Sequence, residues 1–170
     1  MIDFADDAQD LIAGYRRFRA SRYREARDVF YRLRDGQEPE TMIIACADSR
    51  ADPAMIFDAA PGELFTVRNV AALVPPYDES GGLHGVSAAL EFAVTRLKVK
   101  QIVVMGHGGC GGIAASLAAA ADRPVGRFIA PWVEIAADAR DAVLRDENVP
   151  RSDWQEAVEH GAVGLSLTNL

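Results

Sequence analysis

Three residues carry side chains that bind transition metals: Cys46, His107 and Cys110. Two glycines separate His107 from Cys110, so this spacing lets both side chains point into one cavity. Two thiolates and one imidazole leave the fourth position of a zinc ion open, which is typical of catalytic zinc sites. The alternative is a pair of free core cysteines, because unpaired cysteine is often buried as a small apolar residue.

A carboxylate and a guanidinium follow the first cysteine, in the sequence CADSR at 46–50. Alternate residues of an extended segment face the same side, so Cys46, Asp48 and Arg50 are predicted to share one face. An aspartate paired with arginine keeps a lowered pKa and a fixed orientation, and can accept a hydrogen bond from zinc-bound water or hydroxide. Without the candidate zinc ligands, the same two residues would be an ordinary ion pair at a strand end.

The elements that must position these residues alternate between strands and helices. Apolar runs bounded by polar or turn residues predict three strands, at 41–46, 63–67 and 101–105. Helical signals predict a helix that begins at Asp52-Pro53 and is closed by Pro61-Gly62, a helix over 83–97 after a loop over 71–82, and a helix around 113–121. This order predicts an α/β fold with a mostly parallel sheet flanked by helices, whose ligands bind at the carboxyl ends of the strands. Both cysteines lie at such ends.

Both ends of the chain are predicted to be helical. Apolar residues at spacings of three and four from Asp3 to Arg34 indicate an amphipathic N-terminal arm, broken near Ala20 and Ser21. The segment 127–170 is helical in pattern, with Pro131 and Pro150 at starts or breaks and a final helix over 158–170. The eight arginines of 16–34 are interrupted by acidic residues, and we interpret them as a solvated helix face.

Composition bounds the class of protein. With 170 residues, 49% of them apolar and 25% charged, we expect one domain over 1–170 that includes a helical arm over 1–35. The net charge of −7 argues against a nucleic-acid partner. The acidic N-terminus lacks the features of a secretory signal and no run is apolar enough to span a membrane, so we expect a cytoplasmic protein with no membrane partner. A reducing cytoplasm would keep both cysteines as thiols.

The two motifs CADSR (46–50) and HGGC (107–110), in this order, resemble the zinc signature of the β-class carbonic anhydrases. The similarity extends from about Tyr15 to Ile113. It implies an enzyme, a carbonate dehydratase, that uses zinc-bound hydroxide for the reversible hydration of CO2 to bicarbonate and a proton. It also implies a homodimer or homotetramer, in which the N-terminal arm grips a neighbouring subunit.

The resemblance assigns roles by motif position. It implies Cys46, His107 and Cys110 as zinc ligands, Asp48 and Arg50 as the catalytic dyad, and Gln37, Phe65 and Gly111 as substrate contacts. Phe92 stands where a pocket tyrosine is found in the plant-like branch, and Ile43 stands where another branch has a tryptophan near a bicarbonate that closes its site. Family members usually continue past the last helix with an edge strand and a helix, so we expect a family domain without its C-terminal end.

Three other functions fit part of the sequence. The run Gly106-His-Gly-Gly-Cys-Gly111 satisfies the dinucleotide-binding pattern GxGxxG, but no acidic strand end follows about 20 residues later. A zinc-dependent hydrolase of carbonyl sulfide or carbon disulfide could use the same zinc ligands. The ligands could also belong to a catalytically impaired zinc-binding homologue. His84 and His160 are candidates for a proton shuttle by residue type alone.

Overall fold

The computed structural model describes residues 8–170, which fall into two units, one ending at Gln37 and the other spanning Glu38–Leu170. In its described part the first unit has three helices: α2 (Gln9–Ala20), α3 (Arg22–Glu25) and α4 (Arg27–Leu33). Ser21 separates α2 from α3, which confirms the predicted break in the N-terminal arm. The start of the predicted arm, at 3–7, lies outside the described residues.

Aromatic side chains hold the helices of the first unit together. The ring of Phe18 on α2 lies 5.9 Å from the ring of Tyr23 and 5.8 Å from that of Phe30. The rings of Tyr23 and Phe30 are 5.0 Å apart, so one cluster joins α2, α3 and α4. The eight arginines of this unit are exposed, and Arg19 lies over the ring of Tyr23 at 5.1 Å.

The second unit is built on a parallel sheet of three strands in the order β2-β1-β3. The strands are β1 (Thr41–Cys46), β2 (Leu64–Asn69) and β3 (Gln101–Met105). The central strand β1 is buried from Met42 to Cys46, as expected for an apolar strand with neighbours on both sides. The predicted bounds of β1 and β3 are confirmed, whereas β2 begins one residue later and ends two residues later than predicted.

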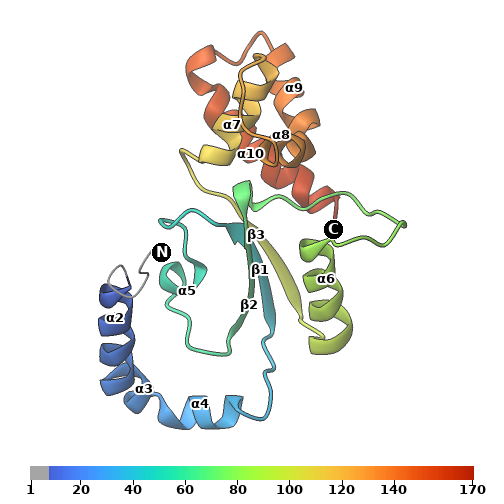
Figure 1. The fold of residues 1–170 in the computed structure, drawn as a ribbon. Coiled ribbons are helices and arrows are strands. Elements are labelled where there is room, and N and C mark those ends of the chain that lie inside the picture. The colour runs from blue at the N-terminus through green and yellow to red at the C-terminus, as the bar shows by residue number, and fades with distance from the viewer. Residues whose placement is uncertain (1–7) are drawn as a thin grey trace. The chain divides into compact units, whose positions relative to one another are not determined.

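The helices of the second unit confirm the α/β class. They are α5 (Pro53–Ile56), α6 (Gly85–Glu91), the π-helix η2 (Phe92–Leu97), α7 (Gly111–Ala120), α8 (Ile129–Val133), α9 (Ala137–Arg145) and α10 (Trp154–Thr168), with short 3₁₀ turns η1 (Val70–Ala72), η3 (Glu134–Ala136) and η4 (Arg151–Asp153). Figure 1 shows α6 beside the sheet and α7 to α10 gathered at the carboxyl ends of the strands. The candidate ligands are therefore placed between the sheet and this helical group.

Several predicted helix boundaries are wrong. Asp52 caps α5 as predicted, since its carboxylate accepts a hydrogen bond from the amide of Met55 at 3.2 Å, but the helix ends at Ile56. Asp58 adopts a left-handed φ of 49°, which stops the helix before Pro61-Gly62. The predicted helix over 83–97 begins at 85 and changes to a π-helix at 92, and the last helix begins four residues before the predicted start at 158.

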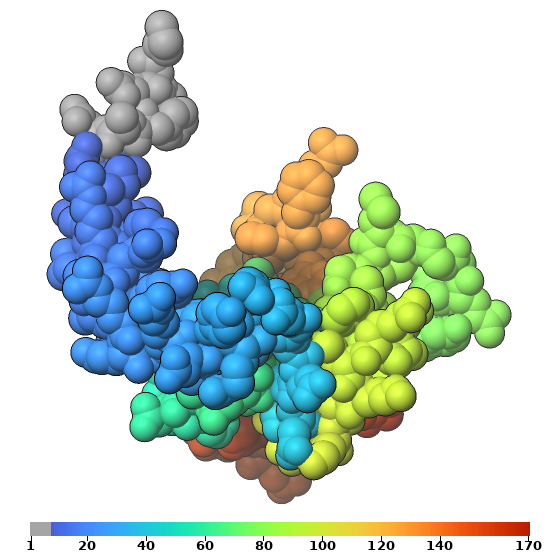
Figure 2. Space-filling view, turned by 90° about the horizontal axis from the view of Figure 1, so that it is seen from below, coloured from blue at the N-terminus to red at the C-terminus, as the bar shows by residue number. Residues whose placement is uncertain are grey.

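Two buried clusters form the core of the second unit. One joins Met42 and Ile44 of β1 to Val86 of α6, and the other contains Cys46 and Cys110 together with residues of η1, α7 and α10. Between η1 and α6, the chain protrudes from this unit (green in Figure 2) and exposes the side chains of Tyr77 and Leu83. Across residues 8–170, no helix is both long enough and apolar enough to cross a membrane.

Candidate metal centre

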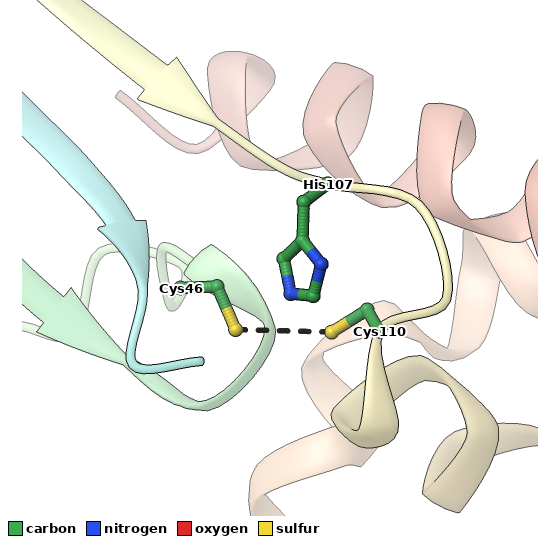
Figure 3. Close-up of side chains that lie close together, drawn as sticks. All are labelled: Cys46, His107 and Cys110. Carbon is green, nitrogen blue, oxygen red and sulfur yellow. Dashed lines mark hydrogen bonds between the residues drawn. The ribbon is translucent and has the colours of Figure 1, made fainter. Parts of the chain in front are cut away.

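The register of the sheet brings the two sequence motifs together. Cys46 is the last residue of β1, and the loop that follows the adjacent strand β3 carries His107 and Cys110. Figure 3 shows the three side chains converging from these two segments. One ligand atom from each residue lies within 4.8 Å of the other two, and both cysteines are buried. The structure therefore brings together the three predicted zinc ligands.

The spacing of the two sulfurs fits a metal ion. Sγ of Cys46 and Sγ of Cys110 are 3.8 Å apart. Two thiolates bound to a tetrahedral zinc ion at about 2.3 Å would place their sulfurs about 3.8 Å apart. The free thiols already hold this separation, so binding of an ion would need little movement of the cysteines.

The imidazole of His107 is oriented as in metal-binding histidines. Its Nδ1 donates a hydrogen bond to the carbonyl of Gly108 at 3.0 Å, which assigns the ring proton to Nδ1 and leaves the lone pair on Nε2. Nε2 is buried and has no hydrogen-bond partner within residues 8–170. A backbone carbonyl that fixes the tautomer of a histidine ligand is a common outer contact of metal sites. An ion would satisfy this unpaired buried nitrogen.

The loop around Cys110 is shaped by a glycine and by the start of α7. Gly109 has a left-handed φ of 66°, a conformation that glycine adopts without steric cost. Burial raises the pKa of the Cys110 thiol, while the amide of Ile113 in the first turn of α7 acts in the opposite direction. Metal binding requires the thiolate, so the amide of Ile113 favours the form of Cys110 that binds a metal.

Asp48 and Arg50 form a close ion pair beside the three candidate ligands. Oδ1 of Asp48 accepts from Nε of Arg50 at 2.9 Å and from its amide at 3.0 Å, and Oδ2 accepts from Nη2 at 2.8 Å. Hydrogen bonds from the Arg50 side chain hold the pKa of the Asp48 carboxyl well below its usual value. Oδ2 also lies 3.8 Å from Nε2 of His107, so an ionised carboxylate faces the place where the candidate ligands converge.

Arg68 of β2 supports the segment after β1, a role that sequence reasoning missed. Its guanidinium donates to the carbonyl of Cys46 at 3.0 Å, to the carbonyl of Asp48 at 2.6 Å and to the carboxylate of Asp52 at 3.0 Å. The position of Arg68 one residue before the end of β2 was the available signal, because that end lies next to Cys46. Arg68 thus fixes the backbone that carries Asp48.

Helix α10 contributes two further residues that sequence reasoning missed. Glu159 is buried and, together with Gln155, makes hydrogen bonds to the backbone of Cys110. The available signal was a carboxylate between Val158 and Ala162, two apolar positions of the same helix face.

Two of the three predicted substrate contacts, Phe65 and Gly111, lie in the second unit. Gly111 directly follows Cys110 as the first residue of α7. Phe65 lies four residues before the end of β2 and packs against the core cluster that contains Met42 and Ile44. Its ring stacks on that of Phe92 at 5.9 Å. Gln37 is the last residue of the first unit.

A cleft of about 650 Å³ lies between the loop after β3 and α10. It is lined by His107 on one side and by Ser152, Glu156 and His160 on the other. His160, one of the two histidines named as shuttle candidates, is therefore placed at the cleft beside the candidate metal centre. The other, His84, lies 3.5 Å from Asp78 in the protruding segment before α6.

Comparison with known proteins identifies the family. Residues 41–170 match the family model described as carbonic anhydrase. The chain belongs to the β-class carbonic anhydrases. It is 35% identical over 168 residues to β carbonic anhydrase 3 of Arabidopsis thaliana. The matched region spans 97% of this chain and 65% of the length of that relative.

Solved β-carbonic anhydrases share the fold. The structure of the β-carbonic anhydrase CcaA covers 97% of this chain and 74% of its own, with 31% identity and a TM-score of 0.89. A β-carbonic anhydrase from the ascomycete Sordaria macrospora, one of two described as tetrameric, covers 96% of this chain and 79% of its own, with 28% identity and a TM-score of 0.79. A Cys-His-Cys cluster next to an Asp-Arg pair thus occurs here in a chain with the β-carbonic anhydrase fold.

Proposed function

We propose that this chain catalyses the zinc-dependent reversible hydration of CO2 to bicarbonate and a proton. The observation that carries the proposal is the convergence of Cys46, His107 and Cys110, with an unpaired Nε2 on His107, beside the ionised carboxylate of Asp48. The three residues would hold zinc through two sulfurs and Nε2. Zinc bound in this way lowers the pKa of water towards neutrality and so supplies a nucleophile for CO2.

Asp48 and Arg50 would orient that nucleophile. Because Arg50 donates to both oxygens of Asp48, the carboxylate is held in one orientation and stays ionised at neutral pH. It can therefore accept a hydrogen bond and direct the attacking lone pair towards the carbon of CO2. The same pairing opposes movement of Asp48 onto the metal, which favours an open site.

His160 would receive the proton that the reaction releases. It is exposed in the cleft that His107 also lines, so solvent and buffer can reach the imidazole directly. Histidine side chains commonly act as proton shuttles in catalysis.

We further propose that the chain acts as a homodimer or homotetramer. Phe65 and Gln37 are two of the three substrate contacts that the family resemblance implies, and Phe65 packs against the core cluster of Met42 and Ile44, not the one that contains Cys46 and Cys110. Assembly would let side chains of a second copy line the site. The tetrameric enzymes from Sordaria macrospora support this proposal. Light scattering on the purified chain would give the mass of the assembly.

Stopped-flow CO2 hydration, with zinc content measured on the same sample across neutral and alkaline pH, tests the proposed function. We expect turnover that requires zinc and rises with pH, because the active nucleophile is deprotonated. A fully zinc-loaded chain that does not hydrate CO2 would contradict the proposal. Release of hydrogen sulfide from carbonyl sulfide or carbon disulfide by such a sample would assign the alternative hydrolase activity instead.

A further inference from the structure

Helix α10 buries a carboxylate directly against the candidate metal centre. Glu159 is 8% exposed and lies on the face of α10 that also buries Val158 and Ala162. A buried carboxylate is costly unless its oxygens accept hydrogen bonds, so its partners indicate what it does. Glu159 also lines the small cavity between Cys46, His107 and Cys110, although it is outside the cluster of candidate ligands.

The partners of Glu159 are the backbone of Cys110 and the side chain of Gln155. Oε1 of Glu159 accepts from the amide of Cys110 at 2.7 Å and from Nε2 of Gln155 at 2.6 Å. Nε2 of Gln155 also donates to the carbonyl of Cys110 at 3.0 Å. The two side chains therefore hold the peptide groups on both sides of the Cys110 Cα atom. Sγ of Cys110 is one rotatable bond from this fixed backbone.

Close packing reinforces this contact between α10 and the loop. A Cβ atom added at Gly106 would come within 2.8 Å of Cγ2 of Val163, one turn along α10 from Glu159. Only a residue without a side chain allows the helix to approach the loop so closely. Helix α10 therefore packs closely on the loop at Gly106 and is hydrogen-bonded to the loop at Cys110.

We propose that Glu159 is a positioning residue for the metal centre, which fixes Cys110 at the sulfur separation that an ion requires. This inference rests on the proposed function. Glu159 acts through the backbone of Cys110 and not as a ligand, because its Oε1 accepts from two donors and its carboxylate lies outside the cluster of candidate ligand atoms. Gln155 assists by holding the adjacent carbonyl. Without these hydrogen bonds, metal binding itself would have to order the loop. The conformational entropy lost in that ordering would weaken metal binding.

Zinc affinity measured by chelator competition tests the inference in four variants of the full chain. Glu159→Ala removes the acceptor, and we expect it to weaken zinc binding by about 10- to 100-fold, as is typical for outer contacts of metal ligands. Glu159→Gln keeps an oxygen in the same place and should restore most of the affinity. Gln155→Ala should cause a smaller loss. Glu156→Ala is the matched control, because Glu156 is an exposed carboxylate on the same helix, in the cleft that His107 lines.

The visible spectrum of the cobalt-substituted protein gives a second readout that a general loss of stability would not produce. We expect Glu159→Ala to change the ligand-field bands, which report the geometry of the metal, while Glu159→Gln and Glu156→Ala keep the wild-type spectrum. Thermal unfolding of the metal-free variants identifies any that fail to fold.

The outcomes separate this inference from the proposed function. Wild-type zinc affinity and cobalt spectrum in a folded Glu159→Ala variant would overturn the positioning role, whatever the turnover. Equal defects in Glu159→Ala and Glu159→Gln would also overturn it, because they would assign the effect to the charge. Normal zinc binding without CO2 hydration in the wild type would overturn only the proposed function.

Discussion

Arg50, which follows β1, donates from Nη2 to the carbonyl of Gly109, in the loop after β3, at 3.1 Å. The same nitrogen donates to Oδ2 of Asp48 at 2.8 Å. One guanidinium therefore holds the carboxylate and also joins the two segments that carry the candidate ligands. The orientation of Asp48 depends on both segments, so a change in either segment would alter the candidate metal centre.

Asp48→Asn should lower CO2 hydration by about 10²- to 10⁴-fold without loss of zinc, because the amide keeps the shape of the carboxylate but loses its charge and one acceptor. Stopped-flow turnover per bound zinc measures the effect. Asp58→Asn is the control, since Asp58 is an exposed residue with a left-handed φ that asparagine adopts readily. Undiminished turnover in Asp48→Asn at full zinc content would exclude the assigned role.

Arg68→Lys should reduce the free energy of unfolding by about 1–3 kcal/mol, because one ammonium group cannot replace a guanidinium that reaches Cys46, Asp48 and Asp52 at once. Urea denaturation of the metal-free protein measures the change. Arg96→Lys, at an exposed position of η2, should leave the midpoint where it is. Equal midpoints for Arg68→Lys and wild type would mean that these three contacts contribute no net stability.

Gly106→Ala should destabilise the protein by about 1–3 kcal/mol, since the new methyl group would meet Cγ2 of Val163 at 2.8 Å. Val163→Ala in the same chain removes the obstructing methyl and should recover part of the loss. A double-mutant cycle from denaturation midpoints measures this coupling. Strictly additive effects would show that the contact between α10 and the loop is not the source of the cost.

Asp141→Asn should change stability in a pH-dependent way, because a hydrogen bond from the buried Arg140 lowers the pKa of Asp141 below its ordinary value of 3.8. A carboxyl group whose pKa is lowered in the folded state stabilises the fold at pH values above its ordinary pKa. This stabilisation is lost as the pH falls through the pKa of the folded state. The variant should therefore be less stable than wild type at neutral pH by about 0.5 kcal/mol, since the carboxylate is partly exposed. The denaturation curves of the variant and the wild type should converge in acid. A stability difference that widens in acid would contradict the lowered pKa of Asp141.

The elements that a local pattern controls were predictable from the sequence. The apolar run of β1 between polar neighbours and the Asp52-Pro53 helix start both gave correct local structure. The end of α5 was not predictable, because it depends on a left-handed residue at Asp58 that no turn signal marks. The π-helix at 92–97 was missed for a similar reason, since its apolar spacing is close to that of an α-helix.

The candidate ligands could also be found from the sequence, because Cys46, His107 and Cys110 have rare side-chain types at the ends of predicted strands. The residues that hold them in place could not. Glu159 and Gln155 act on the backbone of Cys110 from a helix more than forty positions away, and such a contact depends on how α10 packs and not on any local spacing.

The two sulfurs that meet 3.8 Å apart are separated by 64 positions in the chain. An ion held between them would join distant segments as a disulfide does, and closing a loop of this length disfavours the unfolded chain by about 4 kcal/mol on entropic grounds. The contribution would grow with the concentration of free ion, because only the folded chain presents the complete set of donors. Supply of zinc would therefore set the resistance of this protein to heat and proteolysis as well as its turnover.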